Sequence, residues 1–316
     1  MRELTKMHRR DFIKKGGLAC SALALQEGSS FFMREPFSGD DKLPIIDTHL
    51  HLWDLDHLDY PWLKDAENPL SRNFLLADYH KATAGLSIEK MVFVECGRNP
   101  EQYLMEVDWV KGIREKDPRI AGMVAYFPLE KGNSGINAME ILVERNIVKG
   151  IRKAFMPGHS GFLQGISLLK NFGWSYDLNI GPAQLPAAFE FAKSYPDQVI
   201  VLDHIANPDI KNNDWKVWEK AILPFASLDN VKCKISGMLT KTDLSKSGIE
   251  QVEPYFNTIL KVFGTDRVVF GGDWPVLLRA ASYSDWKKAF DTLASHLTFS
   301  ERQKLYQLNA KTIYRI

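Results

Sequence analysis

The chain has 316 residues, of which 45% are apolar and 25% charged, and its formal net charge is +1. This length and composition suffice for one large hydrophobic core or two modest ones. The near-zero net charge excludes the basic surface that nucleic-acid partners require, and no apolar stretch is long enough for a stable membrane span.

The N-terminal residues 1–40 differ from the rest of the chain and resemble an export signal. A basic segment from His8 to Lys15 precedes a short run of small and apolar residues from Gly16 to Leu25. This order is typical of targeting peptides, and Arg9-Arg10 resembles the pair of a twin-arginine signal. We therefore expect residues 1–40 to be a disordered export signal and linker, and the protein to be periplasmic. The alternative is a vestigial leader and a cytoplasmic protein.

The cysteines agree with export of a chain that is already folded. Cys20 lies within the expected signal, and Cys96 and Cys233 fall on strands that are not neighbours. We therefore expect no disulfide, as for a protein that folds in a reducing compartment before it is exported.

From residue 44 onward, short β-branched runs alternate with longer amphipathic segments. The alternation predicts an α/β fold with a parallel sheet and helical crossovers. Eight such strands in about 270 residues match a (β/α)8 TIM barrel, which we place at residues 41–316 as one domain. An open doubly wound sheet is the alternative, but its glycine-rich phosphate turn is absent. The expected strands are 44–49, 90–95, 120–126, 147–153, 177–180, 198–204, 231–236 and 267–273, and the expected helices include 102–115, 138–145, 184–195 and 254–262.

Two histidines close the first expected strand. His49 and His51 are two residues apart, so both side chains leave the same face of the strand, which Asp47 shares. In a closed parallel barrel the first and last strands are neighbours. The histidines are therefore expected to meet whatever side chains end the last strand.

Two further strands end in titratable side chains. Alternation places His204 on the face of Leu202 and Ile200, and Asp273 on the face of Val269. A single strand-end histidine is more often a hydrogen-bonded wall residue. Three strands that end in the same way favour a reaction centre at the carboxyl ends of the barrel strands.

Together these motifs resemble the amidohydrolase superfamily. Over roughly residues 44–316 the chain is similar to the amidohydrolase-2 family, which includes L-fuconolactonases, other sugar-acid lactonases and 2-pyrone-4,6-dicarboxylate lactonases. The motifs that carry the resemblance are IDTHLH at 46–51, QLPAA at 184–188, VLDH at 201–204, CKISG at 233–237 and FGGDWPV at 270–276.

The resemblance implies that His49, His51, His204 and Asp273 face the reaction centre. Hydrolysis of a lactone, which is a cyclic ester, needs an activated water, a stabilised oxyanion and a proton for the leaving alcohol. Asp273 is the best candidate for the base. The histidines are candidates for polarising the carbonyl, either directly or through a bound divalent ion.

Two departures from the superfamily concern the metal. The wider superfamily has a metal-binding histidine on the fifth strand, where this chain has Tyr176 to Ile180. It often has a metal-bridging lysine or glutamate on the fourth strand, where this chain has Arg152 and Lys153. The lactonase branch has Arg-His at that place, so Arg152 matches the branch and Lys153 is a substitution.

A centre of two metal ions therefore lacks its ligands. We expect at most one zinc-like divalent ion, held by His49, His51 and Asp273, with His204 as a further option. The alternative is metal-free catalysis, in which Arg152 and other cationic side chains supply part of an ion's electrostatic effect.

Lys234 is the second candidate cation. It shares strand parity with Ser236, which places it inside the barrel near the top. The other interpretation is a lysine that faces the helices and extends its amino group to water.

These residues predict a hydrolase that opens the lactone ring of a sugar acid or a related small carboxylate. One rival is a metal-dependent decarboxylase or another hydrolase of the same superfamily; a decarboxylase would normally need the fifth-strand histidine. Another rival is a non-catalytic carbohydrate-binding barrel, which would need no water-activating carboxylate.

The oligomeric state stays open. The expected substrate contacts are Trp53, Trp62, Arg152, Lys153, Asp177, Gln184 and Lys234.

Overall fold

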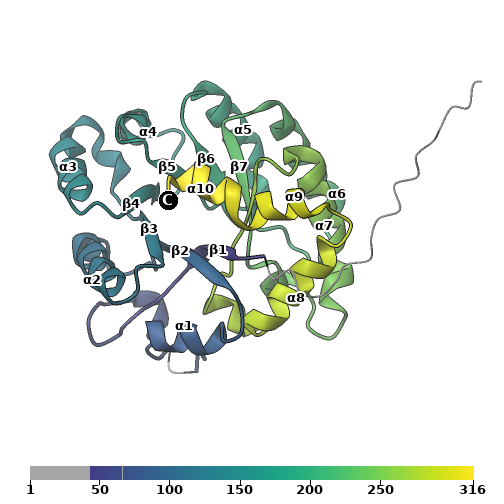
Figure 1. Ribbon diagram of the computed structural model, residues 1–316. Helices are drawn as coiled ribbons and strands as arrows, with labels where there is room; N and C mark the ends of the chain where they lie inside the picture. Colours follow the sequence, from purple (N-terminus) through teal and green to yellow (C-terminus); the bar gives the residue numbers. More distant parts are fainter. Residues whose placement is uncertain (1–42, 66) are drawn as a thin grey trace, which may run out of the picture. The chain divides into compact units, whose positions relative to one another are not determined.

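Eight parallel strands pair in chain order, each with the next, in the computed structural model of the protein (Figure 1). The structure describes residues 43–65 and 67–316. This arrangement confirms the predicted (β/α)8 barrel, although β5 begins earlier than expected, and β6 and β8 end earlier, so that His204 and Asp273 follow their strands. The strands are β1 (Ile45–Leu50), β2 (Ile88–Val94), β3 (Ile120–Ala125), β4 (Val148–Arg152), β5 (Ser175–Leu178), β6 (Ile200–Leu202), β7 (Val231–Ile235) and β8 (Val268–Phe270).

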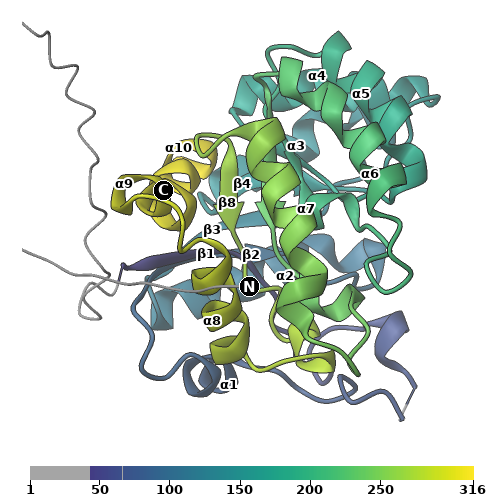
Figure 2. The ribbon, with the colours of Figure 1, turned by 90° about the vertical axis from the view of Figure 1, so that its right-hand side faces the viewer.

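Most of the helices lie around the outside of the strands (Figures 1 and 2). The four predicted helices are present as α2, α3, α5 and α7, but α7 begins at Gly248 rather than at Pro254. Val252 is buried in this additional turn, and its packing outweighs the hydrogen bond that Pro254 cannot donate. The helices are α1 (Leu76–Ala82), α2 (Tyr103–Lys116), α3 (Ile136–Glu144), α4 (Ser160–Phe172), α5 (Leu185–Ser194), α6 (Trp215–Ile222), α7 (Gly248–Phe263), α8 (Tyr283–Leu293), α9 (Phe299–Gln303) and α10 (Asn309–Tyr314).

The first and last strands meet at their carboxyl ends, as a closed barrel requires. The backbone N–H of His51 donates to the carbonyl of Trp274 at 2.8 Å, and the N–H of Asp273 donates to the carbonyl of His49 at 2.8 Å. Gly272 makes this junction possible, because a Cβ at this position would lie 2.6 Å from Oδ2 of Asp47. The junction places the end of β1 against the segment that follows β8.

Small β-branched residues fill the inside of the barrel. Ile46, Val92, Val94, Val124, Val201 and Val269 form one cluster with residues of α10. Helix α10 packs at the amino ends of the strands, where Asn309 donates to the carbonyls of Thr265 and Val268, both at 2.8 Å. The carboxyl ends of the strands are thus the open end of the barrel, as in other barrels of this type.

Within the described residues, no helix is long and apolar enough to cross a membrane. Cys96 and Cys233 are both buried and free, which confirms the expectation of no disulfide between them. The predicted export signal, with Arg9 and Arg10, lies outside the described residues.

Candidate active site

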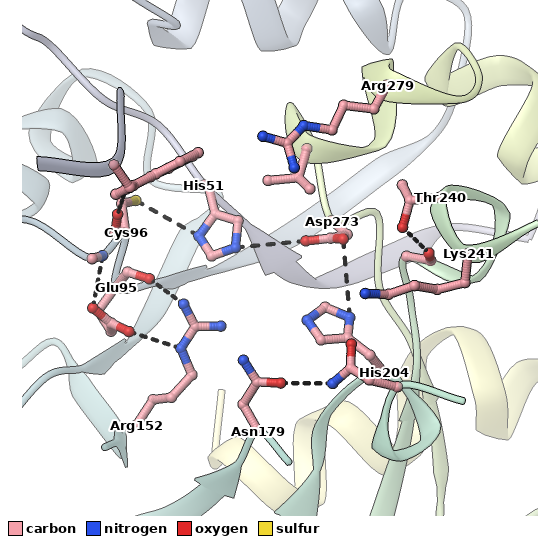
Figure 3. A pocket seen from close by; sticks show the side chains of 15 residues that line it. His51, Glu95, Cys96, Arg152, Asn179, His204, Thr240, Lys241, Asp273 and Arg279 are labelled. Atoms are coloured by element: carbon pink, nitrogen blue, oxygen red, sulfur yellow. Dashed lines mark hydrogen bonds and ion pairs between the residues drawn. The ribbon is translucent and has the colours of Figure 1, made fainter. Parts of the chain in front are cut away.

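Three histidines and one carboxylate converge at the open end of the barrel, and Figure 3 shows three of the four side chains, those of His51, His204 and Asp273. Oδ1 of Asp273 lies 3.8 Å from Nε2 of His49 and 3.6 Å from Nε2 of His51. Oδ2 of Asp273 lies 4.0 Å from Nδ1 of His204. The two Nε2 atoms of His49 and His51 are 3.1 Å apart. The structure therefore brings together all four residues that the sequence placed at the reaction centre.

The outer nitrogens of the two β1 histidines face acceptors, although only that of His51 is within hydrogen-bond distance. Nδ1 of His51 lies 2.8 Å from the carbonyl oxygen of Val94, which can only accept, so this nitrogen carries the proton. Nδ1 of His49 faces Oδ1 of Asp203 at 3.6 Å. When a ring is neutral and its Nδ1 carries the proton, its Nε2 has a free lone pair. In both rings this Nε2 atom is directed at Asp273.

His204 reaches the site by a different route from the one predicted. Leu202 and Ile200 pack in the layer between strands and helices, whereas Val201 and Asp203 face the inside of the barrel. The predicted parity of β6 was therefore wrong. The backbone takes a left-handed conformation at His204, with φ of 50°, and this turn brings the ring back toward Asp273.

Asp47 does not share the face of the histidines. Its carboxylate accepts hydrogen bonds from Tyr79 of α1 and Tyr283 of α8, both at 2.9 Å, and from the backbone N–H of Gly272 at 2.7 Å. The pairing of β1 with β2 is irregular between Asp47 and Leu50, and this irregularity breaks the alternation of side chains. Asp47 therefore holds the junction of β1 with β8 rather than the reaction centre.

A chain of buried charges lies inside the barrel next to the histidines. The amino group of Lys234 is 3.0 Å from Asp177 and 2.9 Å from Asp203, and all three side chains are fully buried. Tyr314 of α10 donates to Asp177 at 2.7 Å, and Asp203 faces His49. Lys234 thus enters the barrel as predicted, but neither it nor Asp177 reaches the cavity surface. Lys234 and Asp177 instead support Asp203, which faces His49, and so help to position this histidine.

Sequence reasoning missed Asp203. Alternation pairs it with Val201, and only the choice of that face as the inward one would have identified it. The sequence prediction assigned the inward face to His204 instead.

A second charged network supports Arg152 on the other side of the site. Nε of Arg152 donates to Oε1 of Glu95 at 2.9 Å, and Nη2 donates to the carbonyl of Glu95 at 2.6 Å. Arg98 binds the second oxygen of Glu95 at 3.2 Å and lies 3.5 Å from Oε2 of Glu106. Glu95 was also missed, although it is the last residue of the predicted second strand. A carboxylate at the carboxyl end of a barrel strand could have identified Glu95 as a site residue.

Burial and neighbouring charges set the ionisation of the centre. Burial lowers the pKa of His49 well below its usual value, and Lys234 acts in the same direction. Burial also lowers the pKa of His204. Burial raises the pKa of Asp273, but His204 and His51 outweigh this effect and hold the pKa low. At neutral pH the centre therefore combines an ionised carboxylate with neutral imidazole rings at His49 and His204.

These side chains border a cavity of about 350 Å³. His51, Trp62, Arg152, His204 and Asp273 line it, so five of the predicted site residues border one space. The volume is that of a small-molecule site. Nε2 of His204 makes no hydrogen bond within the described residues, so this nitrogen is available to a ligand.

The remaining predicted contacts lie away from the cavity wall. Trp53 is fully buried and packs edge-on against Trp62, with ring centroids 5.3 Å apart. Lys153 binds Glu130 at 2.9 Å, and Gln184 is exposed and caps the turn that precedes α5. Trp53 therefore supports Trp62, which donates to the carbonyl of Cys96 at 2.8 Å.

The donor set fits a divalent ion. One ligand atom from each of His49, His204 and Asp273 lies within 4.8 Å of the others, and His51 adds a donor beside Asp273. Metal-binding histidines usually give their second N–H to a carbonyl or carboxylate, as His51 does to Val94. Imidazole and carboxylate together suit zinc and similar metals.

Known proteins resemble this chain over nearly its whole barrel. An L-fucono-1,5-lactonase from Burkholderia multivorans is 27% identical, over 86% of this chain and 96% of that protein. An L-rhamnono-gamma-lactonase from Scheffersomyces stipitis is 24% identical, over 87% of this chain and 99% of that protein. The crystal structure of an amidohydrolase from Burkholderia multivorans with bound zinc matches with a TM-score of 0.78 at 25% identity, over 86% of this chain and 99% of that chain.

The family model of the amidohydrolases matches residues 46–316, from the first barrel strand to the end of the chain. The match includes every side chain of the centre described above. The protein therefore belongs to the amidohydrolase family.

Proposed function

We propose that this protein hydrolyses the lactone ring of a sugar acid. The observation that carries the proposal is that His51, His204 and Asp273 border one cavity, with His49 buried directly beside them. The relatives named as lactonases act on rings of a size that suits this cavity. The convergence also argues against a binding protein without catalysis, because such a protein needs no water-activating carboxylate.

The side chains divide the reaction between them. Asp273 accepts a proton from water as the water oxygen attacks the carbonyl carbon of the lactone. Arg152 and Nε2 of His204 stabilise the negative charge that forms on the carbonyl oxygen. The tetrahedral intermediate then collapses, the bond from carbon to ring oxygen breaks, and Asp273 returns its proton to that oxygen. The product is an open-chain hydroxy acid, whose carboxyl group ionises at neutral pH.

We propose further that one divalent ion binds at His49, His51 and Asp273, with His204 as a fourth ligand. The closeness of the two Nε2 lone pairs, 3.1 Å apart, supports a cation between them. When bound, such an ion would polarise the carbonyl and lower the pKa of a bound water. Asp203 and the carbonyl of Val94 would orient the two rings from behind.

The experiment is a screen of the purified protein, as isolated and after addition of Zn²⁺. Sugar-acid lactones, both neutral and carboxylated, are followed by proton release, and aromatic carboxylates are followed by release of carbon dioxide. The proposal expects proton release above the spontaneous rate for at least one of these lactones, and no decarboxylation. Decarboxylation without lactone opening would refute the proposal, and so would the absence of both activities in a folded protein.

We also propose that the protein is exported through the twin-arginine route, on the strength of Arg9-Arg10 and the apolar run to Leu25. Replacing Arg9-Arg10 by Lys-Lys should then leave the protein in the cytoplasm. A chain that begins at Asp41 should retain full activity and thermal stability. Unchanged export of the Lys-Lys variant would eliminate this route.

A further inference from the structure

Two cationic side chains at the mouth of the cavity have no part in the chemistry described above. Lys241 follows β7 in the turn Met238–Lys241, and Arg279 follows β8 in the turn Val276–Arg279. Both side chains line the same cavity as Asp273 and His204. The two turns contact each other, and both residues are exposed there. Two separate connections of the barrel thus bring a positive charge to one mouth.

Neither cation is neutralised by the protein. Among the residues that the structure describes, no carboxylate forms an ion pair or hydrogen bond with Lys241 or Arg279. The acids of the cavity are engaged elsewhere, since Glu95 binds Arg152 and Asp273 faces the histidines. A ligand in this cavity therefore meets two unsatisfied cations.

These two cations lie on the opposite side of the pocket from Arg152 (Figure 3). Arg152 already supplies a cation at the centre, where Nη1 lies 3.4 Å from Nε2 of His49. Figure 3 shows Arg279 and Lys241 on the Asp273 side of the pocket, across from Arg152 and Glu95. The carboxylate formed by ring opening arises at the reacting carbon, beside Asp273 and within reach of Arg152. Lys241 and Arg279, at the mouth of the cavity, are therefore available to bind a different anionic group.

From this arrangement we infer that Lys241 and Arg279 bind a second carboxylate of the substrate. The substrate is then a lactone that keeps a free carboxylate, such as the monolactone of a sugar diacid, rather than a neutral aldonolactone. This inference rests on the proposed lactonase function. A neutral ring would leave both cations solvated, whereas a carboxylate gains charge-assisted hydrogen bonds from each. We therefore expect the enzyme to distinguish lactones by the charge of their substituent more than by the ring itself.

Matched pairs of lactones test the inference. The 1,4-lactone of glucaric acid carries a carboxylate at carbon 6, where the 1,4-lactone of gluconic acid carries a hydroxymethyl group. The corresponding galacto and manno pairs, together with L-fucono-1,5-lactone and L-rhamnono-gamma-lactone, complete the panel. The measured quantity is the ratio of kcat/KM for the carboxylated lactone to that for its neutral partner.

The wild-type ratio should exceed about ten, as expected for a charge-assisted contact. Lys241→Ala and Arg279→Ala should each lower the ratio about tenfold, and Lys241→Glu should lower it further. Added salt should also lower the ratio, because both cations are exposed. Lys220→Ala, an exposed position of α6 outside the cavity, should leave the ratio unchanged.

Two results would overturn the inference, and they are distinguishable. The first result is a preference for the neutral lactones, or a ratio that Lys241→Ala and Arg279→Ala do not change. This result would refute the binding of a second carboxylate by these residues, but it would leave the lactonase proposal standing. Failure to open any lactone of the panel removes the lactonase proposal and the inference with it.

Discussion

His49 and His51 approach each other with their Nε2 atoms 3.1 Å apart, and both nitrogens face the same oxygen of Asp273. The carbonyl of Val94 fixes the proton of His51 on the opposite nitrogen. In the neutral rings, two lone pairs therefore point at one small space. Such an arrangement is favourable only when a proton or a cation lies between the nitrogens.

The first prediction concerns metal content. We expect no more than one equivalent of divalent ion per chain, because Lys234 already places a buried positive charge between Asp177 and Asp203. Elemental analysis of the purified protein measures this stoichiometry. His51→Ala should lower the zinc affinity at least tenfold, the scale on which metal ligands and their partners act. Two tightly bound ions per chain would contradict the interpretation that the fifth strand, which has no histidine, provides no second metal site.

The second prediction concerns the base. Asp273→Asn keeps the size and the backbone hydrogen bond to His49 but cannot accept a proton from water. We expect the fold to be retained and kcat to fall by ~10²–10⁴-fold. Steady-state kinetics with any lactone that the wild type opens measures the change. A variant that keeps half of the wild-type activity would exclude Asp273 from proton transfer.

The third prediction concerns the buried ion chain. Lys234→Met should lower the free energy of unfolding by about 3–5 kcal/mol, because Asp177 and Asp203 would remain buried without their cation. Denaturation in urea measures the loss. Adding Asp177→Asn to this variant should restore part of it. The matched change at an exposed lysine, Lys220→Met, should have little effect.

An equally small loss at Lys234 and Lys220 would show that the buried carboxylates bind their proton in the native state. In that case Lys234 would not be needed to balance them.

The fourth prediction concerns the pH dependence of stability. Burial raises the pKa of Glu106 to about 7; Arg98 opposes this shift and Glu95 adds to it. The folded state therefore holds this proton at pH values where the unfolded chain has lost it. Stability should decrease as the pH rises from the unfolded pKa toward 7, by up to about 3 kcal/mol.

Glu106→Gln removes this titration. The variant should gain stability relative to the wild type between pH 5 and pH 8, as measured by urea denaturation at each pH. Glu144→Gln, on the exposed face of α3, serves as the control. A constant difference between Glu106→Gln and the wild type over this range would show that Glu106 is ionised throughout.

The order of strands and helices was predictable because each barrel strand is a short buried run with a clear boundary. The convergence of His49, His51, His204 and Asp273 followed from the same logic, since parallel strands in a barrel end on one side. The inward face of β6 was not predictable from alternation alone, because His204 takes a left-handed backbone conformation after the strand has ended.

Asp47 illustrates a second limit. Its carboxylate leaves the expected face because the pairing of β1 with β2 is irregular, and no residue type in the motif reports such an irregularity. The pairing of Glu95 with Arg152 likewise depends on tertiary placement, although each residue was visible at its strand end. Long-range charge pairs of this kind become evident only when the strands are assembled.

The central claim is that this site opens lactones with Asp273 as the base. The most direct measurement compares the initial rate of lactone opening by the wild type, by Asp273→Asn and by buffer alone, with ring opening followed by nuclear magnetic resonance. The claim predicts that the wild type exceeds the buffer rate at least about a thousandfold for one sugar lactone, and that Asp273→Asn loses most of this gain. A folded, zinc-supplied wild-type protein that opens no lactone faster than buffer would contradict the claim.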